Sequence, residues 1–400
     1  SRPGCRGRGP PAGGAPPSVG SRLRVAGPGA PRAHGGRAEI LMQADSAVVT
    51  IHEGDRFETM TVVSAQQITR LDRYTEIRQV LARARDPEAD LDRLSDELVE
   101  IAKSPPPYPA WLAALGVVLF TAGFSVNVQA TWQELWVATA SGCLVALITL
   151  AAQRHERVSQ LVPFIAAVSV SLFVLILYNQ LDLDGGAILL IVPALFFFIP
   201  GDVLSASMFD MSEGRVTAGS TQLVYAIFSI LLLYLGVVFA AALTSTSGDD
   251  LFAEALPGDF PDVVAWLGWV VFTLGFALAF SVAMRHFGWI LLVTLVAFGG
   301  QQVGTMLFGE VIGASVGATA MIVVALIISR DPSRPPNMVL ALCGFFVLTV
   351  GALGLEGFTA LVSGDPVAGF SDLLSMFTIG MAIAIGLLIG SVIGSATAQR

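Results

Sequence analysis

Positive charge is almost absent from all but the first quarter of the sequence. The chain has 400 residues and 22 lysines and arginines, of which only seven lie after Pro105. Charged residues of both signs make up 13% of the chain, whereas a soluble domain carries roughly a quarter. A stretch with so few charges cannot keep a soluble surface hydrated, so we infer that lipid surrounds the chain from about residue 110 onward.

Other absences exclude whole classes of function. Cys5, Cys143 and Cys343 have no metal-binding or redox spacing, so a disulfide framework or a metal site is not expected. The net charge of -9 comes without a basic face, which argues against nucleic-acid binding. There is neither a phosphate-binding loop nor an H-E-x-x-H motif, so we expect no ATP-driven transport by this chain alone, and no cofactor.

One short motif resembles an enzyme signature. Gly313-Ala-Ser-Val-Gly317 fits the G-x-S-x-G pattern, but it falls within an apolar run instead of at a strand-to-helix turn. His286 is the only histidine in the later half of the chain that could serve as a base. We therefore predict that the protein is not an enzyme.

The first quarter of the chain divides into three parts. Residues 1–37 consist mainly of Gly, Pro, Arg and Ala, and they fit either a disordered tail or a non-native leader read from a wrong frame. Residues 38–104 predict a small α+β cytoplasmic region, and residues 105–109 a Pro-rich linker. Within the α+β region we expect a hairpin followed by two helices, with strands at 47–51 and 56–63 and helices at 71–85 and 87–103. We expect Asp86-Pro87 to begin the second helix.

The remainder of the chain reads as an all-α polytopic membrane protein with ten transmembrane helices. Each apolar run is about long enough to cross roughly 30 Å of hydrocarbon. The predicted spans are 110–128, 133–152, 160–179, 185–201, 220–243, 262–283, 287–307, 309–329, 337–356 and 371–395. These spans form a first five-helix module at 110–245, an external acidic loop at 246–261, and a second five-helix module at 262–400.

The seven late arginines predict the orientation. With ten spans, all of them fall on one side of the membrane: Arg154, Arg157, Arg215, Arg285, Arg330, Arg334 and Arg400. The loops on the other side contain no Lys or Arg and are acidic. By the positive-inside rule, both termini are then cytoplasmic.

The two modules repeat one another. The segment 115–125 matches 267–277 at an offset of 152, with seven identities in eleven positions. Further matches recur at an offset of 150 and pair Gly201, Gly214, Ala218, Gly219 and Gly236 with Gly351, Gly364, Ala368, Gly369 and Gly386. Five is an odd number, so the second copy must cross the membrane in the opposite sense. Inverted repeats of this kind are typical of secondary transporters.

The fourth predicted span carries the strongest candidate site. Pro193 and Pro200 each remove a backbone donor, and Gly201 permits unusual dihedral angles. A helix broken at membrane depth presents helix-end dipoles that can hold a carboxylate or an ion. Asp202 follows at once and Asp210 lies about two turns later. The alternative is an ordinary helix exit with solvated acids in a cytoplasmic loop.

Polar residues in other spans are further candidates for substrate binding or coupling. Gln301 and Gln302 lie within the seventh span, where they could line a path or merely join helices. Glu310 and Glu356 lie near the outer ends of the eighth and ninth spans. A carboxylate in a membrane is a candidate for proton coupling, and interfacial solvation is the alternative for both.

The stretch from Val192 to Gly236, with its Ile-Pro-Gly-Asp segment, resembles the threonine/serine exporter family. The plan of a hydrophilic N-terminal region followed by two related five-span halves is similar to that family. The resemblance implies export of threonine and serine driven by the proton motive force. Two departures are the segment that replaces the family's usual first helix, and Val350-Gly351, which stands where Pro200-Gly201 would recur.

We therefore predict a secondary transporter that exports small neutral amino acids by proton antiport in a bacterial cytoplasmic membrane. Its partners would be a small amino acid, protons and the lipid bilayer, with a second copy of the chain as a further candidate. The alternative function is a non-catalytic membrane scaffold or assembly subunit, in which the many glycines serve helix packing alone.

Overall fold

The computed structural model describes residues 37–42, 46–53, 56–63, 70–84, 86, 88–129, 131–152, 161–181, 186–212, 216–246, 251, 260–348 and 366–396. Several predictions fall outside these residues. They concern the leader at 1–36, Gly351, Glu356, and the arginines Arg154, Arg157, Arg215 and Arg400.

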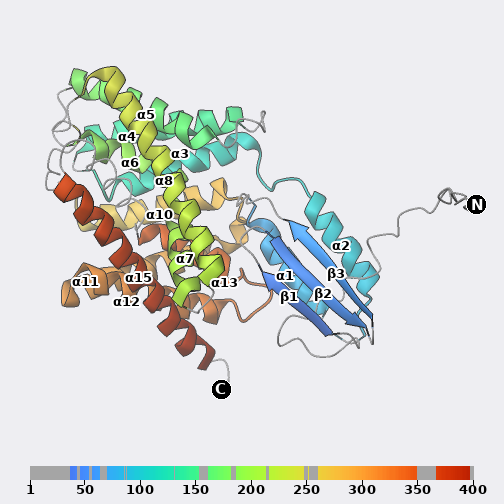
Figure 1. Ribbon diagram of the computed structural model, residues 1–400. Helices are drawn as coiled ribbons and strands as arrows, with labels where there is room; N and C mark the ends of the chain where they lie inside the picture. Colours follow the sequence, from blue (N-terminus) through green and yellow to red (C-terminus); the bar gives the residue numbers. More distant parts are fainter. Residues whose placement is uncertain are drawn as a thin grey trace, which may run out of the picture.

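The N-terminal region is an antiparallel sheet with two helices. Its strands pair in the order β1 (Arg37–Met42), β2 (Ser46–Glu53) and β3 (Arg56–Val63), followed by α1 (Asp72–Arg83) and α2 (Leu91–Lys103). Glu53 pairs with Arg56, as expected for the predicted hairpin, whereas β1 was not predicted. Figure 1 shows this region standing to one side of the remaining helices.

The start of α2 differs from the prediction at Asp86-Pro87. The helix begins at Leu91, and Asp90 caps it by accepting a hydrogen bond from the Arg93 backbone N–H at 3.2 Å. An Asp side chain satisfies an otherwise unpaired donor of the first turn, which Pro87 cannot do.

Most of the rest of the described chain is helical. Its α-helices, with one 3₁₀ turn (η3) in the first group and another (η4) in the second, fall into two groups in chain order. The first group is α3 (Ala110–Ser125), α4 (Trp132–Ala152), α5 (Val162–Leu181), α6 (Ala187–Leu195), η3 (Phe196–Phe198), α7 (Gly201–Ser212) and α8 (Val216–Thr244). The second is α10 (Asp262–Ala279), η4 (Met284–His286), α11 (Phe287–Phe308), α12 (Glu310–Ile328), α13 (Asn337–Val347) and α15 (Pro366–Ala396).

Apolar helices lie at all ten predicted ranges. Among the described residues, five are long and apolar enough to cross a membrane, namely α4, α8, the segment Met284–Phe308, α12 and the part of α15 from Leu373 to Gly394. The five shorter apolar helices are Ala110–Ser125, Val162–Tyr178, Ala187–Phe198, Val263–Ala279 and Asn337–Val347. The protein is therefore mostly helical and carries several candidate spans.

Helices α3 and α10, which contain the repeated segments, pack directly against each other. Gly116 lies against Gly275 and Gly123 lies against Gly268, at distances that leave no room for a side chain. Gly116 and Gly268 are equivalent at the offset of 152, and so are Gly123 and Gly275. In each pair, the glycine nearer the N-terminus of one helix lies against the glycine nearer the C-terminus of the other, so the two helices run antiparallel. Each contact has a counterpart under exchange of the helices, as at an isologous twofold interface.

Corresponding helices of the two halves also have corresponding neighbours. In the first half α4 packs on α6 and α5 packs on α8; in the second, α11 packs on α13 and α12 packs on α15. Helix α8 begins at residue 216 and α15 at residue 366, which are equivalent at the offset of 150. The halves are linked by α3 against α10 and by α7 against both α13 and α15.

Candidate functional site

A helix break lies where the sequence predicts one. Helix α6 contains Pro193 and ends at Leu195, and a single 3₁₀ turn follows over Phe196–Phe198. Ile199 is extended, with a ψ of 120°, and α7 begins at Gly201. The chain thus leaves one helix and enters another within a few residues. We call residues 196–200 the break.

Most of the break is buried in protein, while Phe197 and Phe198 are half-buried. Leu195, Phe196 and Ile199 are at most 2% exposed, and Pro200 and Gly201 are buried as well. Non-helical backbone at membrane depth is tolerated only where protein or a water-filled cavity surrounds it. The burial of the break is consistent with that requirement.

Two helix ends flank the break. The last carbonyls of α6 and the first N–H groups of α7 have no partners within their own helices. The C-terminal end of a helix carries partial negative charge and the N-terminal end partial positive charge. A ligand with both an ammonium and a carboxylate group could therefore be held between them.

Pro193 produces a further unpaired carbonyl, and a side chain from another helix satisfies it. Since Pro193 has no N–H, the carbonyl of Leu189, four residues earlier, has no donor inside α6. Gln129 Nε2 donates to this oxygen at 2.7 Å. Gln129 follows the end of α3 and is only 5% exposed. No motif marks Gln129 in the sequence, although the position of Pro193 indicates that the carbonyl four residues earlier needs a donor from elsewhere.

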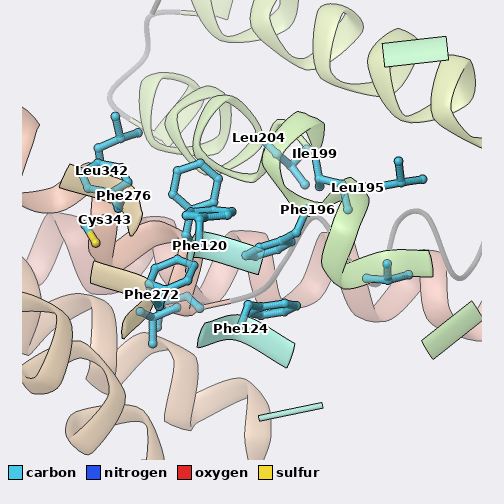
Figure 2. Close-up of a cluster of buried hydrophobic side chains, with 14 of the residues drawn as sticks. Phe120, Phe124, Leu195, Phe196, Ile199, Leu204, Phe272, Phe276, Leu342 and Cys343 are labelled. Atoms are coloured by element: carbon cyan, nitrogen blue, oxygen red, sulfur yellow. The ribbon is translucent and has the colours of Figure 1, made fainter. Parts of the chain in front are cut away.

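Aromatic side chains fill the space beside the break. The cluster comprises Phe120, Phe124, Phe196, Phe197, Trp269, Phe272, Phe276, Phe280 and Phe346. Figure 2 shows Phe196 facing Phe124 while Phe120 lies near Phe272. We call these nine residues the aromatic cluster. It combines side chains from α3, η3, α10, the turn after α10 and α13, so both halves contribute to it.

Equivalent residues of the two halves meet inside this cluster. Phe196 and Phe346 correspond at the offset of 150, and their ring centroids are 5.7 Å apart at an angle of 71°. Phe196 belongs to the break, and Phe346 lies one residue before the end of α13. The turn after α6 therefore meets the end of α13 in the aromatic cluster.

A few buried polar atoms have no hydrogen-bond partner within the described chain. In the membrane helices they include Thr121 Oγ1, Ser171 Oγ and Trp269 Nε1. Thr273, the equivalent of Thr121, donates instead to the Trp269 carbonyl at 2.7 Å. Unsatisfied polar atoms cost stability when buried, so they are possible binding groups for a polar ligand.

The two carboxylates predicted near the break lie on α7. Asp202 is its second residue, although the structure does not describe its side chain. Asp210 lies two turns later and accepts a hydrogen bond from Gln222 Nε2 of α8 at 3.2 Å. Asp210 thus links α7 to α8, whereas Asp202 is at the N-terminus that faces the break.

The remaining described candidates lie away from the aromatic cluster. Gln301 is half-buried in the contact between α11 and α12, beside Gly313 and Gly317. Gln302 is exposed, as is Glu310 at the first position of α12. Among the described residues, no group of three or more His, Cys, Asp or Glu could hold a metal ion.

Comparison with known proteins gives one match. The ThrE family model, described as a threonine/serine exporter, matches residues 31–244, which is more than half of the chain. The match covers the N-terminal region and ends at the last residue of α8. Neither a curated protein nor a solved structure matches the chain.

Proposed function

Because the chain belongs to the threonine/serine exporter family, we propose that it exports small neutral amino acids such as threonine and serine, in exchange for protons. The family is one of multi-pass membrane transporters. The observation that carries the proposal is the buried break between α6 and α7, which provides two helix ends at one place inside the bundle. Their dipoles suit the two opposite charges of an amino acid.

The proposal includes ten spans arranged as two inverted repeats. Support comes from the ten apolar helices at the predicted ranges, although five are shorter than the usual span. Helix α3 has 16 residues and would be about 24 Å long, so the bilayer would thin locally or flanking residues would complete the crossing. The antiparallel contact between α3 and α10 is what inverted repeats require.

The proposed orientation places both termini in the cytoplasm of a bacterium. Arg285 lies in η4, before α11, and Arg330 and Arg334 lie between α12 and α13. Arg334 also lies over the Trp289 ring, with its guanidinium carbon 4.7 Å from the ring centroid. Arginine and tryptophan are both typical of the membrane–water interface.

In the proposed site the substrate carboxylate would lie at the N-terminus of α7. The ammonium group would face the last carbonyls of α6 and the Asp202 carboxylate. Asp202 would also be the first candidate for proton coupling, with Asp210 as the second. The aromatic cluster fills the space beside this site, so we infer that it must separate before a substrate can enter or leave.

The scaffold alternative makes a different prediction in purified vesicles. Proteoliposomes loaded with unlabelled threonine should take up labelled threonine by counterflow if the protein is a transporter. If folded and inserted protein gives no more uptake than protein-free vesicles, the proposal that it is a transporter is rejected. Repeating the assay with an imposed pH gradient tests proton coupling separately.

A further inference from the structure

The N-terminal region and its linker form hydrogen bonds with the turn that follows α10, residues 280–282. The backbone N–H of Leu71, just before α1, donates to the Phe280 carbonyl at 3.1 Å. Tyr108 Oη, in the linker before α3, donates to the Val282 carbonyl at 2.8 Å. The N-terminal region and the linker that joins it to α3 therefore both contact the same three-residue turn.

The geometry of this turn directs those carbonyls outward. Ser281 has a φ of 57°, and the N–H of Val282 bonds back to the Ala277 carbonyl at 2.7 Å. This is a helix end closed by one left-handed residue. The turn satisfies carbonyls at the end of α10 and leaves the Phe280 and Val282 carbonyls to accept from Leu71 and Tyr108.

The side chain of Phe280 points into the aromatic cluster. Its ring centroid is 4.7 Å from that of Phe276, 5.4 Å from Phe197 and 6.0 Å from Phe346. Phe197 belongs to the break. One residue thus contacts the N-terminal region through its carbonyl and the aromatic cluster through its ring.

Two more contacts attach the N-terminal region to the other helices, one through the core that both halves form and one to the second half. The Leu71 side chain is 1% exposed and packs within the main hydrophobic core. Arg78 of α1 donates to the carbonyl of Ser329, immediately after α12. The covalent connection, however, runs through residues 104–109 to α3 of the first half. The N-terminal region therefore bridges the two halves.

We propose that the N-terminal region is a cytoplasmic clamp that keeps Phe280 in the aromatic cluster and so holds the cytoplasmic side of the bundle closed. If the halves move relative to each other during transport, the contacts of Leu71 and Tyr108 must stretch or break because they join one half to the other. Their strength then sets how often the cluster opens. The consequence for export rests on the proposed function, but the test below does not.

Cys343 is a native probe of that opening. It is 0% exposed and lies on α13, where its sulfur accepts a hydrogen bond from Thr294 Oγ1 at 3.2 Å. Figure 2 shows Cys343 beside the aromatic side chains. In a chain with Cys5→Ser and Cys143→Ser, the rate of its reaction with N-ethylmaleimide reports how often the centre opens.

Tyr108→Phe removes the hydroxyl that donates to the Val282 carbonyl and keeps the ring, and it should raise the Cys343 labelling rate about fivefold, the equivalent of one neutral hydrogen bond. Leu71→Ala is the second variant and should also raise the rate. Matched controls are Tyr74→Phe and Leu81→Ala, two exposed positions on α1 that should leave the rate unchanged. Thermal unfolding and size-exclusion profiles establish that each variant is folded.

Unchanged or slower labelling in both clamp variants would overturn the proposal, as would an equal increase in the two controls. The counterflow assay is independent of this result. If the protein shows no counterflow but the clamp variants still label faster, the proposed function is rejected and the clamp is supported. If the protein shows counterflow but the clamp variants label at the normal rate, the proposed function is supported and the clamp is rejected.

Discussion

Phe120 of α3 and Phe272 of α10 are equivalent residues of the two repeated segments, and their ring centroids are 4.4 Å apart. Between antiparallel elements, a residue that touches its own equivalent lies at the position expected for a twofold relation. The glycine pairs on either side of these rings exchange in the same way. The contact between the two rings and the two glycine contacts thus all follow the same exchange of α3 with α10.

The close approach at this crossing should be sensitive to one added methyl group. Gly123→Ala would place a Cβ against the Phe272 backbone, which cannot move aside without displacing α10. We expect a loss of at least about 1–3 kcal/mol in the free energy of unfolding, seen as a lower thermal midpoint in detergent. The control is Gly288→Ala, where no atom lies within 4 Å of the new Cβ. It should be neutral or stabilising by up to about 1 kcal/mol. Equal effects at the two sites would contradict the close packing.

The bond from Gln129 to the Leu189 carbonyl should matter only while Pro193 is present. Gln129→Leu leaves that carbonyl buried without a donor, which costs about 1–3 kcal/mol. Pro193→Ala restores an N–H four residues after Leu189, so Gln129→Leu should cost clearly less in that background. A double-mutant cycle on thermal unfolding measures the coupling. Gln302→Leu, at an exposed position, is the control. Additive losses would show that Gln129 does not compensate for the proline.

The carboxylate at the start of α7 should be required for transport and dispensable for folding. Asp202→Asn keeps the size of the side chain and removes its charge, and we expect threonine counterflow to fall to the level of empty vesicles. Glu310→Gln removes a carboxylate that is exposed at the first position of α12, and it should transport normally. Wild-type counterflow in Asp202→Asn would remove this residue from the proposed site.

Tyr108 should lose its proton at a higher pH than an ordinary tyrosine. Burial raises the pKa of Tyr108 above 10.0, against a smaller opposing effect of a backbone hydrogen bond, and the negative charge of Asp72 raises it further. Because the pKa of Tyr108 is higher in the folded state, its contribution to stability is complete below pH 10. That contribution is lost as the pH rises through the folded-state pKa. The ultraviolet difference spectrum between wild type and Tyr108→Phe isolates its phenolate. A midpoint at or below 10.0 would contradict the burial of this side chain in the clamp.

Much of the secondary structure could be predicted because its signals are local. Runs of apolar residues mark the membrane helices, and a break next to Pro200 and Gly201 follows from the chemistry of those two residues. The hairpin between β2 and β3 was predicted on the same basis. The start of α2 was not, because Pro87 and Asp90 both suit a helix start and only the observed hydrogen bond from Arg93 to Asp90 distinguishes them.

The sequence by itself determined the apolar helices, the position of the break and the internal sequence matches, since each depends on composition or spacing along the chain. Only the tertiary structure decided which faces meet: α3 against α10, Gln129 against Leu189, and Leu71 against the turn after α10. Hydropathy cannot decide this, because a side chain that faces lipid is as apolar as one that faces another helix. Contacts between residues some 60 to 210 positions apart depend on how the helices pack, and no local pattern specifies that.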